Sequence, residues 1–197
     1  PTLSDGLDFR SSGRVILHTG KVNIGQHITS ALVLIAAEEL NINPNQIAVA
    51  QTRTDSSPNE SYTVGSQSMQ HSGYAIKKAA ATARNELTVR AAKFFSVSVE
   101  QIKIEDGNLF IEKTNQSISY WELVKNAPLE CYVDETVDVK NHALHQLQGK
   151  HHIARGMWDI VTGKYEFIQD LKLPNMLHAR VIRPPQYHAK LGNVDEK

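Results

Sequence analysis

Apolar residues repeat with a helical period in two long segments of this chain, at residues 27–40 and from residue 68 or 73 to residue 95. Positions three, four and seven apart share one face of an α-helix, so each segment is expected to bury one side. The expected buried positions are Ile28, Leu32, Ile35, Ala36 and Leu40 in the first helix, and Ile76, Ala79, Ala80, Ala83, Leu87, Ala91 and Phe94 in the second. The residues of the second helix expected to face water are Lys77, Lys78, Arg84 and Glu86. The many alanines of this helix predict close packing against a neighbouring element.

Shorter patterns predict β-strands around these helices. Residues 14–19 form an apolar, β-branched run after a glycine, and residues 46–54 alternate as a half-buried strand does. A hairpin is expected over residues 102–111, with its corner at Asp106-Gly107 or Gly107-Asn108. Ser119 and Glu122 have the spacing of a capping box, which predicts a short helix over residues 119–124.

The C-terminal third has a weaker pattern. Residues 126–152 show no clean periodicity, and we interpret them as a linker that wraps over a partner or another domain. After a turn near residue 163, a strand is expected within residues 173–185. The predicted fold class is α+β, a mixed sheet packed by the two main helices. The predicted organisation is a domain segment at 13–125, a connector at 126–160 and the start of a second domain at 161–197.

Composition excludes several classes of function. The chain has 197 residues with 21 basic and 21 acidic side chains, so it lacks the positive surface of a nucleic-acid-binding protein. The single cysteine, Cys131, excludes an internal disulfide and any multi-cysteine metal site. No apolar run reaches the roughly 18 residues of a transmembrane helix. Neither His142 and His145 nor the adjacent His151 and His152 have a third ligand at metal-binding spacing, so we predict no metal site and no catalytic residue.

The first candidate binding segment is Gly25, Gln26 and His27, at the expected start of the first helix. Glycine lets a ligand approach the backbone closely, and the glutamine amide both donates and accepts hydrogen bonds. Unpaired N–H groups and the helix dipole attract a phosphate to such a place. An ordinary strand-to-helix turn with a polar start explains the same residues equally simply.

The second candidate segment is Gly65, Ser66, Gln67 and Ser68, ahead of the second long helix. Its hydroxyls and successive N–H groups suit a small anion-binding nest. A plain helix N-cap, with Ser66 or Ser68 as the capping residue, is the alternative.

Four segments together resemble one family. They are residues 19–26 (Thr-Gly-Lys-Val-Asn-Ile-Gly-Gln), 36–40 (Ala-Ala-Glu-Glu-Leu), 62–68 (Tyr-Thr-Val-Gly-Ser-Gln-Ser) and 173–185 (Leu-Pro-Asn-Met-Leu-His-Ala-Arg-Val-Ile-Arg-Pro-Pro). In this order they are similar to the molybdopterin-binding (large) subunit of the xanthine dehydrogenase/aldehyde oxidase superfamily. The branch with the large subunits of isoquinoline 1-oxidoreductase and nicotinate dehydrogenase is the most similar. The resemblance runs from about residue 13 to residue 185.

The resemblance implies a molybdopterin cofactor with molybdenum, in the cytosine dinucleotide form, and oxidative hydroxylation of an N-heterocycle or an aldehyde. It implies that the first segment (Gly25, Gln26 and His27) meets the pterin or its phosphate, and that the second segment (Gly65, Ser66, Gln67 and Ser68) binds the phosphate or nucleotide end. The implied partners are the remainder of the large subunit, a small iron–sulfur subunit and an electron acceptor such as a cytochrome. Residues 161–197 would then begin an a/b hammerhead domain. The compartment, periplasm or cytoplasm, stays open.

Two features depart from the family pattern. His27 stands where the family usually has glycine, and the Gly-x-Gly-Glu segment that carries the family's catalytic glutamate is absent. We therefore expect an N-terminal piece of such a subunit that is catalytically inert by itself and holds no cofactor tightly. The alternative is a non-catalytic assembly or interaction domain of the same fold that has lost the cofactor, for which His27 is the hint.

Overall fold

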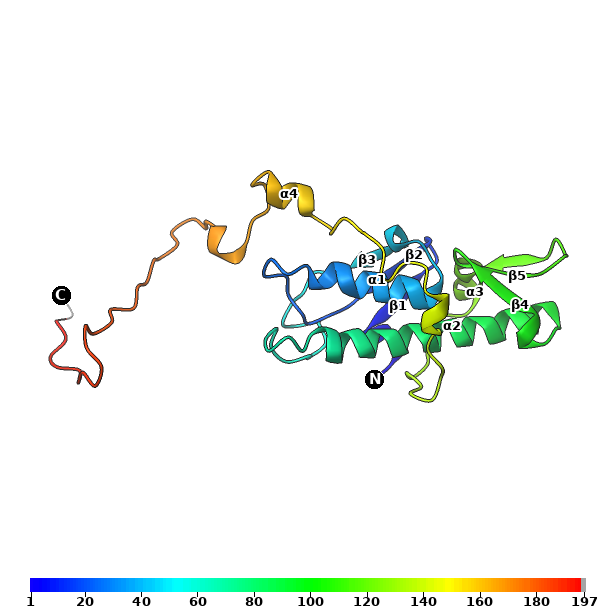
Figure 1. Cartoon of the computed structure of the whole chain (residues 1–197), viewed down its shortest axis with the longest axis horizontal. Helices are drawn as coiled ribbons and strands as arrows, with labels where there is room; N and C mark the ends of the chain where they lie inside the picture. The colour runs from blue at the N-terminus through cyan, green and yellow to red at the C-terminus, as the bar shows by residue number, and fades with distance from the viewer. Residues whose placement is uncertain (196–197) are drawn as a thin grey trace. The chain divides into compact units, whose positions relative to one another are not determined.

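The computed structural model describes residues 1–195, which divide into two compact units, 1–158 and 159–195. Almost all regular structure lies in the first unit (Figure 1). Its elements in chain order are η1 (Leu3–Asp5), β1 (Leu7–Arg10), β2 (Arg14–Leu17), α1 (Ile28–Leu40), η2 (Pro44–Gln46), β3 (Ile47–Val49), η3 (Met69–Gly73), α2 (Tyr74–Phe95), η4 (Val99–Gln101), β4 (Ile102–Glu105), β5 (Asn108–Ile111), β6 (Ser117–Ser119), α3 (Tyr120–Asn126) and η5 (His142–Leu144). Two short helices follow, α4 (Met157–Val161) and η6 (Ile168–Asp170).

The strands form two small sheets. β1 pairs antiparallel with β2, and β2 pairs parallel with β3, so the first sheet is mixed as predicted. The hairpin of β4 and β5 is also confirmed, and β6 extends it to a second, antiparallel sheet. The sequence pattern missed β1 and β6. The α+β class is confirmed.

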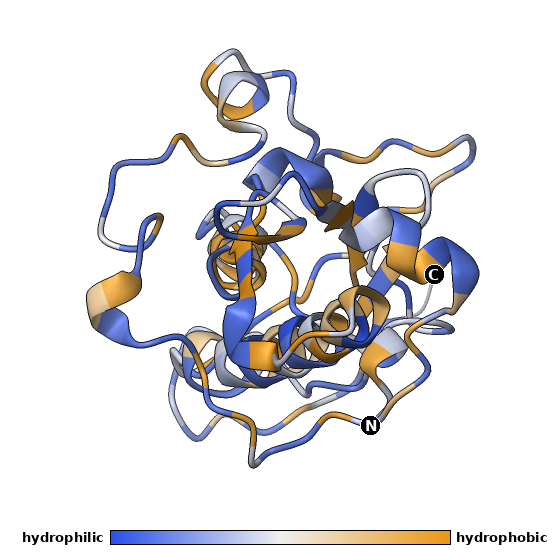
Figure 2. Cartoon of the chain, turned by 90° about the vertical axis from the view of Figure 1, so that its right-hand side faces the viewer, coloured by the Kyte–Doolittle hydropathy of each residue, from blue (hydrophilic) through white to orange (hydrophobic). Residues whose placement is uncertain are grey.

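The two long helices pack side by side with their N-terminal ends at the same edge of the first unit (Figure 1). All five apolar positions expected on α1 are buried, and apolar residues gather along this helix in Figure 2. At the contact, a Cβ on Gly73 would lie 3.2 Å from Ile35 Cδ1. Gly73, directly ahead of α2, therefore permits close approach at this point, and Ala79, Ala80 and Ala83 of α2 are buried as predicted.

Two positions on α2 contradict the expected helix faces. Phe94 is 64% exposed, although the period put it on the buried side. Lys78 is only 9% exposed, and its ammonium donates to the carbonyl oxygens of Glu135, at 2.7 Å, and Val137, at 2.9 Å. Phe94 lies in the last turn of α2, which extends past the end of α1 (Figure 1). Lys78 is buried because another segment of the chain covers the polar side of α2, which the helical period alone does not reveal.

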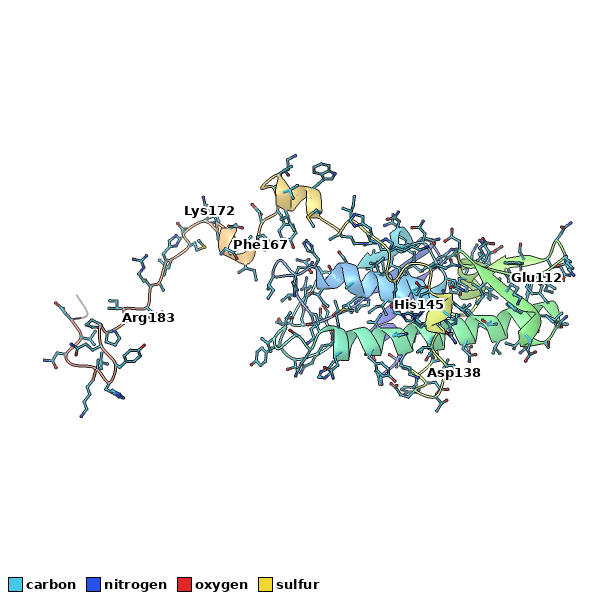
Figure 3. All side chains as sticks on the ribbon, viewed as in Figure 1. Glu112, Asp138, His145, Phe167, Lys172 and Arg183 are labelled. Atoms are coloured by element: carbon cyan, nitrogen blue, oxygen red, sulfur yellow. The ribbon has the colours of Figure 1, made fainter. Side chains whose placement is uncertain are left out.

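That segment is residues 126–152, which return over α1 and α2 of their own unit. Figure 3 labels Asp138 and His145 on it. The guanidinium of Arg84 donates to the Asp138 carbonyl oxygen at 3.1 Å, and the Thr82 hydroxyl accepts from the Asp134 N–H at 3.1 Å. The segment is therefore fastened by polar side chains of the helix that it crosses.

The predicted turn and helix cap were confirmed, whereas two predicted strands were too long or absent. The Ser119–Glu122 capping box forms at the start of α3, and Asp106 and Gly107 make the hairpin turn. The strand expected over residues 46–54 shrinks to β3, and no strand forms within residues 173–185. That part of the second unit has no partner strand among residues 159–195, and a strand without one leaves its backbone groups unpaired.

Candidate functional site

The loop that leads into α1 has an unusual backbone. Gly25 has φ +99°, and His27, the N-cap residue, has φ +57° in the left-handed region. The His27 side chain makes no capping bond; instead Asn23 Oδ1 accepts from the Thr29 N–H at 3.3 Å, and Asn23 Nδ2 donates to Thr29 Oγ1 at 2.8 Å. Asn23 is thus a cap that sequence reasoning missed, because it lies outside the usual capping spacing.

Gln26 closes this loop on itself. Its Nε2 donates to the Val22 carbonyl oxygen at 2.9 Å, and its Oε1 accepts from the Ile24 N–H at 2.7 Å. One amide N–H and one oxygen lone pair of this exposed side chain remain free. Gln26 therefore shapes the loop and can still contact a ligand.

The loop ahead of α2 presents free hydroxyls. Gly65 and Ser66 both adopt left-handed φ values, +62° and +56°, inside a turn that the Gln67 N–H closes on the Val64 carbonyl oxygen at 3.3 Å. Within residues 1–195 the Ser66 and Ser68 hydroxyls make no hydrogen bond, and no side chain caps η3 or α2. Ser68 does occupy the N-cap position of η3, but neither serine side chain makes a capping hydrogen bond, so both hydroxyls are available to a ligand.

Lys21 and Thr63 hold the two loops together. The Lys21 side chain is 3% exposed, and its ammonium donates to the carbonyl oxygens of Glu60 and of Tyr62, the latter at 2.8 Å. The Val22 N–H donates to Thr63 Oγ1 at 3.1 Å. A buried ammonium needs such partners, because an unpaired charge inside a protein is very costly. The resemblance included Lys21, but its clamping role was not predicted.

Gly20 fits the same junction through close contact. A Cβ on Gly20 would lie 2.3 Å from the Pro58 carbonyl oxygen, well inside van der Waals distance. The Glu60 carboxylate accepts from the Gly20 N–H at 2.7 Å. Residues 19–22 thus serve chiefly to dock the loop of residues 58–63.

The two predicted segments meet in one groove of about 410 Å³. Gln26 contributes from the first loop, and Gly65, Ser66 and Ser68 contribute from the second. The other lining residues are Ile24, Ile28, Ala31, Thr63, Val64 and Met69. No charged side chain lines the groove, so it suits a largely neutral, flat group that hydrogen bonds to serine and backbone donors.

Three predicted residues lie outside this groove. Gln67 folds back so that its Cγ and Cδ are 3.8 Å from where a Gly65 Cβ would be. A Cβ on Gly25 would meet nothing within 4 Å, so the space beside it is open. His27 lines a neighbouring cavity, which Gln26 also lines.

The C-terminal end of α1 is structural. Glu38 is 1% exposed, and its carboxylate accepts from Lys140 Nζ at 2.7 Å and from the backbone N–H groups of Gln146, Leu147 and Gln148. Burial by itself raises the pKa of Glu38, but these donors outweigh it and lower the pKa to about 2. The neighbouring Glu39 accepts from Arg84 Nη1 at 3.0 Å. The Ala-Ala-Glu-Glu-Leu segment of the resemblance therefore anchors residues 140–148.

Two other kinds of site find no support in the described part of the chain. Residues 1–195 bring together no group of three or more His, Cys, Asp or Glu side chains that could hold a metal ion. No helix among them is long and apolar enough to cross a membrane.

The sequence was compared with protein families and with curated proteins. The sequence profile of the molybdopterin cofactor-binding domain matches residues 6–167. A nicotinate dehydrogenase subunit of Pseudomonas putida is 34% identical over 173 residues, which are 88% of this chain and 14% of that protein. The gamma subunit of the 6-hydroxypseudooxynicotine dehydrogenase complex of Paenarthrobacter nicotinovorans is 29% identical over 118 residues, 60% of this chain and 15% of that protein. The chain thus spans about a seventh of the length of these relatives.

Solved structures share the fold. CO dehydrogenase from Oligotropha carboxidovorans superposes with a TM-score of 0.56 at 21% identity, over 66% of this chain and 18% of that one. Quinoline 2-oxidoreductase from Pseudomonas putida 86 gives 0.52 at 21% identity, over 60% and 15%. At such identity the likeness establishes the fold alone, whereas the profile match covers most of the sequence. The chain belongs to the molybdopterin cofactor-binding domain family, within the xanthine dehydrogenase superfamily.

Proposed function

We propose that this chain is part of a molybdenum hydroxylase subunit, in which its groove holds part of a molybdopterin cofactor, in the cytosine dinucleotide form. The observation that carries the proposal is the meeting of Gln26 with Gly65, Ser66 and Ser68 in one groove. The reaction would be oxidative hydroxylation of an N-heterocycle or an aldehyde. In its support, the relative with 34% identity is named for nicotinate, an N-heterocycle.

The residues of the groove fit such a group. The Ser66 and Ser68 hydroxyls have no partner within residues 1–195, and the left-handed turn at Gly65 leaves the backbone accessible. The cofactor supplies the redox-active molybdenum, while this chain supplies neutral hydrogen-bond donors and an apolar wall that orient and shield it. Gln26 would contact it through its remaining amide N–H.

The proposal places the reaction elsewhere in a larger protein. The chain lacks a Gly-x-Gly-Glu segment, so we propose that it is inert alone and works with the remainder of a large subunit. A small iron–sulfur subunit and an acceptor such as a cytochrome would carry the electrons away. Residues 161–197 would begin a hammerhead domain.

The experiment uses the complete large subunit that contains this chain, with Ser66 and Ser68 both replaced by Ala. Loss of both hydroxyls should lower the molybdopterin content and the turnover by at least fivefold, while the folded fraction is unchanged. Gln116→Ala, at an exposed position, is the matched control. Unchanged cofactor content in the double variant would favour the alternative of a non-catalytic assembly domain.

A second experiment tests whether the isolated chain binds the cofactor tightly. The 197-residue chain is incubated with molybdopterin cytosine dinucleotide, and binding is followed by fluorescence. A groove open on one side offers few converging contacts, so we expect binding weaker than micromolar. Micromolar or tighter binding would contradict the view that the chain supplies only part of the site.

A further inference from the structure

A second cavity lies on the other side of Gln26 and has about 520 Å³ of space. It is formed by the first turns of α1, by residues 43–45 and by the end of the segment that crosses the helices. The lining residues are Gln26, His27, Ser30, Ala31, Val33, Leu34, Asn43, Pro44, Asn45, Leu147, His152, Ile153, Ala154 and Arg155. Because Gln26 also lines the groove described above, one extended ligand can reach both spaces.

The two spaces differ in charge. The groove has no charged lining residue, whereas the second cavity is lined by Arg155 and by the imidazoles of His27 and His152. No Asp or Glu lines it. An arginine is charged at every accessible pH, so without a nearby carboxylate the cavity favours an anion.

Arg155 is held in place by the walls of the cavity. Its backbone N–H donates to the Ser30 hydroxyl at 3.0 Å, and its Nη2 donates to the Pro44 carbonyl oxygen at 2.6 Å. Within residues 1–195 the other guanidinium N–H groups make no hydrogen bond and no ion pair. A guanidinium that is fixed at one nitrogen and free at the others is prepared for a phosphate, which it can bind with two parallel hydrogen bonds.

We propose that this second cavity, through Arg155, binds the phosphate part of the ligand, while the uncharged groove holds its ring system. The assignment of the ring system to the groove rests on the proposed function, whereas the assignment of the phosphate to the second cavity does not. It moves the phosphate away from Gly65, Ser66, Gln67 and Ser68, to which the resemblance assigned the phosphate or nucleotide end. His27 then has a place in the site, because the side chain that replaces the family's glycine lines the phosphate cavity.

The experiment titrates the ¹⁵N-labelled chain with inorganic pyrophosphate and follows the amide signals by NMR. Signals of His27, Ser30 and Arg155 should shift, with an affinity that Arg155→Gln weakens at least fivefold. Arg14→Gln removes the same charge from an exposed site at the start of β2 and should leave the affinity unchanged. The amide spectrum of each variant shows directly whether it is folded.

Three results would overturn the inference: no binding of pyrophosphate, equal weakening by both arginine variants, or shifts confined to Gly65, Ser66 and Ser68. The last would leave the proposed function standing with the phosphate in the groove. Conversely, Arg155-dependent binding of pyrophosphate, combined with unchanged cofactor content in the Ser66 and Ser68 double variant, would leave a phosphate site and refute the cofactor groove.

Discussion

The polar groups at the two ends of α1 differ in whether they have hydrogen-bond partners within the fold. At the C-terminal end, the buried carboxylates of Glu38 and Glu39 are surrounded by donors from Lys140, Arg84 and the backbone. At the N-terminal end, the capping residue His27 makes no side-chain bond. The neighbouring loop leaves serine hydroxyls without partners within residues 1–195.

This difference distinguishes polar groups that are paired within the fold from polar groups that the fold leaves free. A buried charge with all its donors present contributes to the fold, since removing one partner leaves the other unpaired. Free donors beside a groove contribute little to the fold and are available for binding. Both ends carry segments of the family resemblance, and only the structure shows that the polar groups of one end are paired and those of the other are not.

The largest expected effect is at the C-terminal end. Glu38→Gln keeps the volume but leaves the Lys140 ammonium and the backbone donors poorly matched, which should lower the free energy of unfolding by about 3–5 kcal/mol. Urea unfolding at neutral pH measures it. Glu112→Gln, on the exposed surface, is the control and should change stability little. A loss below 1 kcal/mol for Glu38→Gln would show that the carboxylate is not an anchor.

The second prediction concerns pH. The pKa of Glu38 is about 2 in the folded state against an ordinary value of 4.5, so the folded state binds this proton less readily than the unfolded state. The stabilisation is complete above the ordinary value and is lost as pH falls toward 2, by on the order of 3 kcal/mol. The stability gap between wild type and Glu38→Gln should therefore close between pH 5 and pH 2. A gap that is constant over this range would contradict the prediction.

The third prediction addresses the clamp between the loops. Gly20→Ala places a Cβ against the Pro58 carbonyl oxygen and should cost about 1–3 kcal/mol, because backbone must move to admit it. Gly6→Ala is matched, since its Cβ would meet Ile76 Cδ1 at an ordinary 3.6 Å. If both variants unfold at the same urea concentration, residues 58–63 are not held as described.

The fourth prediction concerns the left-handed backbone of His27 at the N-terminal end of α1. His27→Gly removes the strain of a left-handed side-chain residue and should raise stability by up to about 1 kcal/mol. His27→Ala keeps a Cβ and should bring no such gain. A glycine variant that is less stable than wild type would mean that the His27 side chain packs usefully.

The smallest expected effect is that of the Ser66 and Ser68 double change to alanine, within about 0.5 kcal/mol of wild type. Neither hydroxyl bonds within residues 1–195, so the fold should not depend on them. Thermal unfolding checks this, with Thr82→Ala as the contrasting variant, because the Thr82 hydroxyl accepts from the Asp134 N–H. A loss above 1 kcal/mol in the double variant would assign the serines a structural role.

Local features of the fold could be predicted from the amino-acid sequence. The helical periods located α1 and α2, and the spacing of Ser119 and Glu122 located the start of α3. These signals succeed because they depend on contacts within a few residues. The same reasoning chose Gln26, Gly65, Ser66 and Ser68, which line one groove, but it did not reveal that they share it.

Other features depend on contacts between distant parts of the chain. Lys78 is buried because a segment more than 30 residues away covers its side of α2. Arg155 contacts Ser30 near the start of α1, and Glu38 and Glu39 at the C-terminal end of α1 bind the chain that leads to it. Such contacts depend on which distant groups become neighbours, and a local pattern of polar and apolar residues does not determine this.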